Sequence, residues 1–150
     1  MNQYAISTPE GTRDRLFAAT RMFRQNEKRI RDLFEARGYD VFTQAGSSIG
    51  QEKMYKLTDR NGRLLVLRPD NTTPIARVVT TKLNDDVLPL RLYYMQKVHR
   101  ASSFHRGHST EVMQAGAELL GARGMMADID ILTTAFAALA AVRGETFRIE

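Results

Sequence analysis

The chain has 150 residues, 43% of them hydrophobic and 26% charged, which is typical of a globular protein with one buried core. It contains no cysteine, which excludes disulfides and thiolate metal sites and leads us to expect a cytoplasmic protein. The net charge is +5, so anionic ligands or nucleic acid are conceivable partners, although the basic residues are spread out as on a solvated surface.

The first expected element is a long amphipathic helix over residues 13–37. Gly38 can end this helix, and residues 39–43 then have the composition of a short strand. The apolar stripe of the helix repeats every seven residues, at Leu16, Phe23 and Ile30.

A hairpin is expected over residues 54–68, because Asn61-Gly62 stands between two apolar runs. Pro69 ends its second strand, and Asn71 or Thr72 can cap a helix that runs to about Leu83.

Two longer strands are expected at residues 91–98 and 112–120, as antiparallel neighbours joined by the loop between them. A second long helix follows over residues 125–143, and residues 146–150 resemble a strand that the chain end cuts short. Helices at both ends of hairpin-linked strands predict an α+β fold with an antiparallel sheet. The apolar stripe of the second helix is expected at Ile129, Leu132, Phe136 and Leu139.

No contact with a membrane is expected. We expect no apolar run that approaches the roughly 18 residues needed to cross a bilayer. The first residues also lack the basic and then apolar layout of a secretory signal.

The three histidines, His99, His105 and His108, lie together in the loop between the two longer strands. A metal site is one interpretation, but zinc sites usually have tighter ligand sets and no H-E-x-x-H motif is present. We therefore expect no metal and interpret this segment as a polar loop.

The run Leu67-Arg-Pro-Asp-Asn-Thr-Thr-Pro74 places a carboxylate and a hydroxyl where a strand turns into a helix. Asp70 could receive a ligand ammonium, with Thr72 beside it. The alternative is that these side chains only cap the helix.

The run Gln114-Ala-Gly-Ala-Glu118 places Gln114, Gly116 and Glu118 on the same side of a strand. The glycine would leave room between two polar side chains that could hold an amine or an imidazole. An exposed sheet face is the alternative.

Three runs in this order resemble the catalytic core of class II histidyl-tRNA synthetases: LRPDNTTP from Leu67, LRLYYMQKVHR from Leu90 and GHSTEVMQAGAELLG from Gly107. The opening PEGTRD and the later GYDVF are similar to the start of that core. The resemblance implies a synthetase-like antiparallel sheet flanked by helices. Residues 1–150 would form the N-terminal portion of this single domain, which is incomplete in the chain.

The resemblance also implies a histidine pocket. Asp70 and Thr72 take the acidic and hydroxyl positions of the run that binds the amino group of histidine. Arg100 takes the position of the arginine that contacts the carboxylate and the activated phosphate. Gln114 and Glu118 take the positions that grip the amino group and the imidazole.

The nucleotide loop departs from the family pattern. Ser102 replaces the glutamate that reads adenine, and His108 and Thr110 replace two arginines. Adenylyl transfer depends on such preorganised charge, so we expect no efficient amino-acid activation, no catalytic residue and no cofactor.

A paralogous family has this combination, the regulatory subunits of short-form ATP phosphoribosyltransferase, which tend to have R-P-D as at residues 68–70. This resemblance implies a non-catalytic homodimer that assembles with the separate catalytic subunit and transmits feedback by histidine on the first step of histidine biosynthesis. A true histidyl-tRNA synthetase is the alternative. A third possibility is a module that senses tRNA, but no aromatic cluster supports nucleic-acid binding, which we do not expect.

Overall fold

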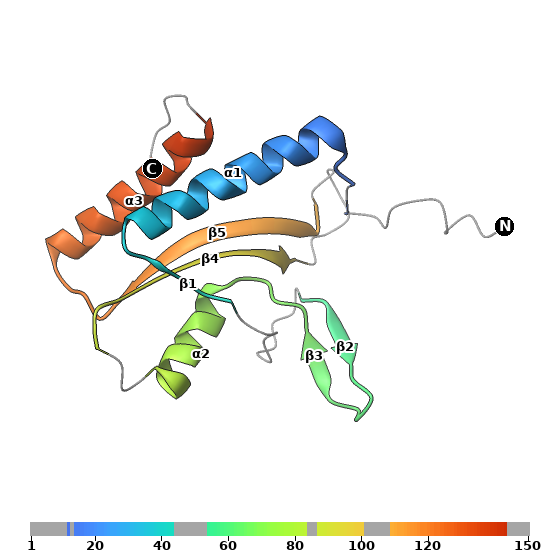
Figure 1. Ribbon diagram of the computed structural model, residues 1–150. Coiled ribbons are helices and arrows are strands. Elements are labelled where there is room, and N and C mark those ends of the chain that lie inside the picture. The colour runs from blue at the N-terminus through green and yellow to red at the C-terminus, as the bar shows by residue number, and fades with distance from the viewer. Residues whose placement is uncertain (1–11, 13, 44–53, 84–86, 101–108, 144–150) are drawn as a thin grey trace.

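The structure is a computed structural model that describes residues 12, 14–43, 54–83, 87–100 and 109–143. Helices α1 and α3 lie side by side above a sheet, and α2 and a hairpin lie below it (Figure 1). In chain order the elements are α1 (Phe17–Ala36), β1 (Asp40–Val41), β2 (Lys56–Thr58), β3 (Leu64–Val66), α2 (Thr72–Lys82), β4 (Leu90–His99), β5 (Glu111–Leu120) and α3 (Met125–Arg143).

Strands β4 and β5 form a ten-residue antiparallel pair, with Leu90 opposite Leu120 and His99 opposite Glu111. The predicted pair of neighbouring strands is therefore confirmed. β1 lies along the other edge of β4 and runs parallel to it, so the sheet is mixed at this edge. The sequence pattern does not predict this parallel pair. It is possible because the hairpin and α2 lie between β1 and β4 and provide a long crossover.

The two faces of the sheet bury different clusters, because neighbouring residues of a strand point to opposite faces. On the side of α1 and α3, the buried residues Phe34, Tyr39 and Tyr93 form one cluster. On the side of α2, the buried residues Ile75, Leu92 and Tyr94 form the other. The adjacent residues Tyr93 and Tyr94 thus belong to separate cores.

Helix α1 is shorter and less buried than predicted. It begins at Phe17, and the side chain of Leu16 is 65% exposed. Its C-terminal half follows the prediction, since Ile30 packs against the cluster that contains the buried Phe34. The apolar stripe is therefore confirmed only where the helix crosses the sheet.

The predicted hairpin is confirmed as β2 and β3, with Thr58 opposite Leu64. Its connection is longer than a two-residue turn. One carboxylate oxygen of Asp59 accepts hydrogen bonds from the backbone N–H groups of Asn61 and Arg63, at 2.8 and 2.9 Å. Gly62 has a φ of 77°, which a residue without a side chain adopts at little cost.

Helix α3 has the predicted bounds, but the prediction of its buried face is wrong. Ile131 and Ala138 pack against the cluster of Phe34, and Thr134 is fully buried. Arg37 of α1 donates a hydrogen bond to the Thr134 hydroxyl at 3.1 Å. The predicted stripe lies on the opposite side of the helix, where its four members are 44–51% exposed. The face of α3 toward α1 therefore carries Ile131, Thr134 and Ala138.

Residues Met125–Val142 of α3 are also long and apolar enough to cross a membrane, with a mean hydropathy of 1.7 over 18 residues. The expectation that no run approaches this length is therefore wrong, by length and composition alone. One such helix is weak evidence for a membrane span. In the structure Asp130 of this helix pairs with Arg91 of β4 at 2.7 Å, and the helix covers one face of the sheet.

Candidate functional site

The candidate site lies on the α2 face of the sheet, where the N-terminus of α2 meets β5. This face contains three residues of β5: Gln114, Gly116 and Glu118. On β4, Gln96 lies opposite Gln114 and Tyr94 lies opposite Gly116. The predicted common side of the three β5 residues is confirmed by the register.

Two hydrogen bonds tie the start of α2 to β5. The Asn71 side-chain amide donates to Oε1 of Gln114 at 2.9 Å, and the Thr72 hydroxyl donates to Oε1 of Glu118 at 2.8 Å. Asn71 is fully buried, so its amide needs such a partner. Sequence reasoning considers Asn71 only as a helix cap and misses this role. Two polar side chains four positions apart on β5 are thus each bonded to one of two consecutive residues at the start of α2.

Asp70 has the structural role that the sequence leaves open. One of its carboxylate oxygens accepts a hydrogen bond from the backbone N–H of Thr73 at 3.0 Å, which caps the first turn of α2. This contact confirms helix capping.

Arg100 lies beside the same turn. Its Nε donates to the carbonyl oxygen of Pro69 at 3.0 Å, and its backbone N–H donates to the carbonyl oxygen of Thr110 at 3.0 Å. None of the ion pairs found among the described residues involves this guanidinium. A positive charge is therefore present next to Asp70 without a carboxylate partner in the described part of the chain.

The room that Gly116 was expected to leave is occupied by Tyr94, which lies directly opposite on β4. A methyl group at position 116 would clash with the tyrosine hydroxyl and would lie 2.5 Å from its Cζ. Burial raises the pKa of the Tyr94 hydroxyl, a hydrogen bond with Thr72 opposes this rise, and the charges of Glu118 and Asp70 add to it. Sequence reasoning missed Tyr94, although the tyrosine opposite a glycine becomes evident once the register is known.

Two of the three residues that replace the nucleotide-binding pattern, Ser102 and His108, lie outside the described residues, as does His105. Of this set only Thr110 is described, at the base of the loop beside Arg100. Among the residues that the structure does describe, no group of three histidine, aspartate or glutamate side chains could hold a metal ion.

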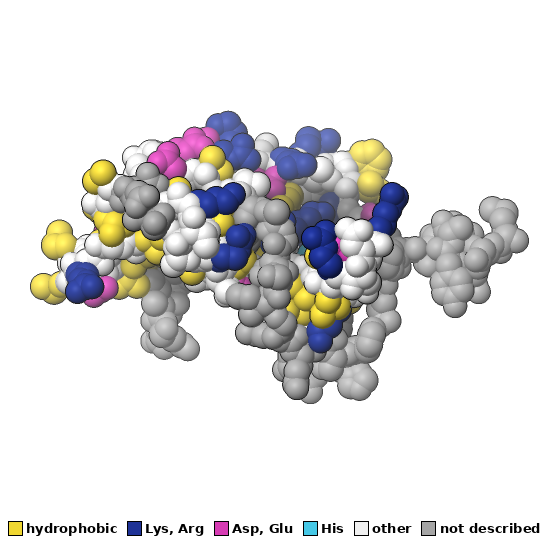
Figure 2. Space-filling model, turned by 90° about the horizontal axis from the view of Figure 1, so that it is seen from below, with side chains coloured by type: hydrophobic (Ala, Val, Ile, Leu, Met, Phe, Trp, Pro, Cys, Tyr) yellow, Lys and Arg dark blue, Asp and Glu magenta, His cyan; other side chains and the backbone are white. Residues whose placement is uncertain are grey.

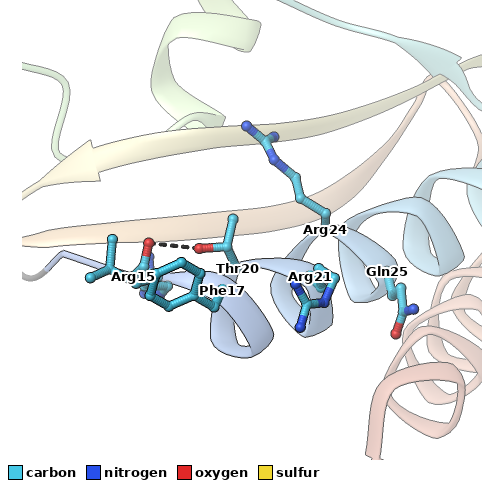
Figure 3. A pocket seen from close by; sticks show the side chains of 7 residues that line it. Arg15, Phe17, Thr20, Arg21, Arg24 and Gln25 are labelled. Carbon is cyan, nitrogen blue, oxygen red and sulfur yellow. Dashed lines mark hydrogen bonds between the residues drawn. The ribbon is translucent and has the colours of Figure 1, made fainter.

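A hollow lies away from the candidate site, at the N-terminal end of α1 (Figure 3). It is lined by three arginines, of which Arg15 lies over the ring of Phe23 at 4.6 Å and Arg24 pairs with Glu27 at 2.9 Å. Figure 2 shows further Lys and Arg side chains scattered over the face seen from below, not gathered in one stripe. This distribution agrees with a solvated basic surface.

The side chains at the candidate site suit a small ligand that has both charges. Carboxylates at Asp70 and Glu118 can receive an ammonium or an imidazolium, and the Arg100 guanidinium can receive a carboxylate. The amide of Gln114 and the hydroxyl of Thr72 can fix its orientation. These groups are held by β5, by the residue after β4 and by the capped first turn of α2.

Comparison with known proteins identifies the family of the chain. Residues 11–150 match the family model described as histidyl-tRNA synthetase. The chain is 40% identical over 161 residues to an ATP phosphoribosyltransferase regulatory subunit of Clostridium novyi (strain NT), covering 100% of this chain and 38% of that protein. It is also 40% identical over 162 residues to the protein of the same name from Acetivibrio thermocellus, again covering 100% of this chain and 38% of the relative.

Solved structures share the fold. The crystal structure of an ATP phosphoribosyltransferase regulatory subunit/histidyl-tRNA synthetase from Bacillus halodurans C superposes with a TM-score of 0.82 at 31% identity, covering 95% of this chain and 40% of that one. Apo histidyl-tRNA synthetase of S. aureus has a TM-score of 0.74 at 21% identity, over 91% of this chain and 34% of that one, a likeness of fold alone. The chain thus spans less than half the length of the relatives it matches. It belongs to the histidyl-tRNA synthetase family.

Proposed function

We propose that the protein containing this chain is a regulatory subunit of ATP phosphoribosyltransferase and has no catalytic activity of its own. The observation that carries the proposal is the 40% identity, along this whole chain, to proteins named as such regulatory subunits. The substitutions at Ser102, His108 and Thr110 support it, because they remove charged groups that activation of an amino acid by ATP requires.

Histidine is the proposed ligand of the candidate site. The contacts of Gln114 with Asn71 and of Glu118 with Thr72 keep two polar side chains of β5 oriented toward the start of α2. Asp70 and Arg100 add one negative and one positive group at the same turn. These four polar positions match the ammonium, imidazole and carboxylate groups of a free amino acid.

The proposed partner is the short-form catalytic subunit, with this protein present as a homodimer within a hetero-oligomer. Feedback requires that histidine bind one state of the assembly more tightly than another. A pocket formed where a helix end meets a strand can supply this difference, because a shift of α2 relative to β5 would separate Asn71 from Gln114 and Thr72 from Glu118.

The test is an assay of phosphoribosyl-ATP formation by the catalytic subunit from the same genome, with and without this protein, at increasing histidine concentration. The catalytic subunit alone is the control. We expect a faster reaction that depends on this protein and is inhibited by histidine. If the rate does not change and the two proteins do not co-elute, the proposal fails.

A histidyl-tRNA synthetase is the second candidate, since the matching family model has that description. A synthetase would catalyse ATP–pyrophosphate exchange that depends on histidine, whereas a regulatory subunit without catalytic activity would catalyse none. Restoring the family pattern with Ser102→Glu, His108→Arg and Thr110→Arg together is expected to increase the affinity for ATP. If the triple variant binds ATP no better than the natural protein, the loss of the nucleotide site needs another explanation.

A further inference from the structure

The side-chain amide of Gln114 has one end in use and one end open. Its Oε1 accepts a hydrogen bond from the side-chain amide of Asn71 at 2.9 Å. Its Nε2 has no hydrogen-bond partner among the described residues, and it is not one of the side-chain atoms that are buried without a partner. An amide nitrogen donates hydrogen bonds and accepts none. Position 114 therefore offers N–H donors to a ligand.

Asn71 is placed so that it fixes this orientation of Gln114. It is fully buried and directly precedes α2, but its side chain makes no capping hydrogen bond. The neighbouring Asp70 caps the helix instead, through the backbone N–H of Thr73. Because a buried amide N–H without a partner is costly, Asn71 keeps the Oε1 atom of Gln114 turned toward α2.

Glu118 offers a ligand the opposite kind of group. Its Oε1 accepts from the Thr72 hydroxyl at 2.8 Å, and its Oε2 has no hydrogen-bond or ion-pair partner in the described part of the chain. An ionised carboxylate only accepts hydrogen bonds. Gln114 and Glu118 are four residues apart, about 13 Å along the strand, so they meet opposite ends of a ligand the size of histidine.

The charges around the site have the same polarity. Arg100 lies nearer to Gln114 than to Glu118, because its backbone N–H is bonded to the carbonyl oxygen of Thr110, just before β5 begins. Its guanidinium lies against the carbonyl oxygen of Pro69, beside Asp70. One end of the site therefore has the donors of Gln114 and Arg100, and the other has the Glu118 carboxylate.

We propose that Asn71 makes Gln114 a hydrogen-bond donor to the carboxylate of bound histidine, so that the imidazole of the ligand is directed to Glu118. This inference rests on the proposed function, because it takes histidine as the ligand. Arg100 shares the carboxylate, and Asp70 receives the ammonium that is attached to the same carbon atom. Asn71 is thus a positioning residue, and Gln114 is the residue that touches the ligand.

Titration calorimetry with the full-length protein tests the proposal by comparing histidine with histidinol, which lacks the carboxylate but keeps the ammonium and the imidazole. Gln114→Met removes the amide. It should weaken histidine binding about tenfold, the effect of losing a hydrogen bond to a charged group, and histidinol binding by less than about twofold. Equal losses for the two ligands would mean that Gln114 binds the ammonium or the imidazole, and they would overturn the proposal.

Gln96→Met is the matched control for this comparison. Gln96 lies directly opposite Gln114 on β4, but its amide donates to the carbonyl oxygen of Phe42 at 3.0 Å. Its loss should leave the ratio of the two affinities unchanged. A ratio that falls as far as in Gln114→Met would show that the effect is not specific to position 114, and would overturn the proposal.

Asn71→Asp tests the positioning role. Aspartate is an equally good residue before a helix, but it only accepts hydrogen bonds, so it would draw Nε2 of Gln114 toward itself and turn Oε1 to the ligand. Histidine affinity should fall about tenfold, as for the loss of a hydrogen bond to a charged group. Because the new charge alone also repels the carboxylate, the substitution is repeated in a Gln114→Met background, where the loss should be smaller. An equal loss would overturn the role of Asn71.

The outcomes also distinguish this inference from the proposed function. If Asn71→Asp does not fold, the comparison of ligands in Gln114→Met still decides. Binding of histidine by the natural protein, with equal losses for histidine and histidinol in Gln114→Met, would leave the histidine pocket standing and overturn this inference. No binding of histidine by the natural protein would overturn both.

Discussion

The two faces of the sheet are formed by the same strands, β4 and β5, but they differ in how they are covered. Toward α1 and α3, β4 presents Tyr93, whose ring stacks on Phe34 with centroids 5.3 Å apart. Toward α2, the next residue, Tyr94, shares its face with polar side chains of β5 and with the start of a helix. One face is closed by apolar packing, and the other is closed partly by hydrogen bonds that a ligand could join or replace. The candidate site lies on this second face, where polar residues of β5 meet the start of α2.

The largest expected effect comes from truncating the two cores. Phe34→Ala and Ile75→Ala each remove a side chain that is no more than 3% exposed, and each should lower the free energy of unfolding by about 3–4 kcal/mol. Only Ile75→Ala should also weaken histidine binding, because Ile75 supports α2 and Tyr94. Urea denaturation and calorimetric titration measure the two effects. Equal losses of affinity in both variants would mean that the faces are not independent.

The next effect is on binding. Glu118→Ala should weaken histidine binding roughly 30-fold, since a hydrogen bond to a charged group is lost. Glu111→Ala is the control on the same strand. Glu111 pairs with Lys97 at 2.7 Å, on the face opposite Glu118, and its loss should leave the affinity unchanged. If Glu118→Ala binds as tightly as the natural protein, histidine acts at another place.

Much of this fold could be predicted from the sequence, and the reasons are local. The β4–β5 pair follows from two apolar runs, and the hairpin from Asn61-Gly62. The common face of Gln114 and Glu118 follows from the alternation of a strand alone. What could not be predicted depends on tertiary partners. The parallel pairing of β1 and the ring of Tyr94 above Gly116 both require the register of distant segments.

The face of α3 is the clearest failure and has a physical cause. This helix is apolar on nearly all sides, so the hydrophobic pattern does not select one face. In the structure the face toward α1 carries Ile131, Thr134 and Ala138, which are packed or hydrogen-bonded against residues of α1. Large side chains such as Leu132 remain on the other side, 51% exposed.

Substitutions at two adjacent residues of α3 test which face of this helix is buried. Ile131→Ala should lower the free energy of unfolding by about 2 kcal/mol, because Ile131 packs against the cluster of Phe34. Leu132→Ala, one residue away on the exposed side, should change it by less than about 0.5 kcal/mol. Equal losses in urea denaturation would show that the helix is buried on both sides.

The smallest effect concerns the hydroxyl on the apolar face. Burial, together with the hydrogen bond and the charge of Glu35, raises the pKa of Tyr93 to about 12 from an ordinary value of 10.0. Because the folded protein holds this proton more tightly than the unfolded chain, the contribution to stability is complete below pH 10 and is lost as the pH rises toward 12. Tyr93→Phe has no such proton. At pH 8 the free energy of unfolding of the natural protein should exceed that of this variant by about 1 kcal/mol. This difference should decrease between pH 10 and 12. Urea denaturation of both proteins across this range measures the difference, and a constant difference would mean that the hydroxyl titrates alike in the folded and unfolded chains.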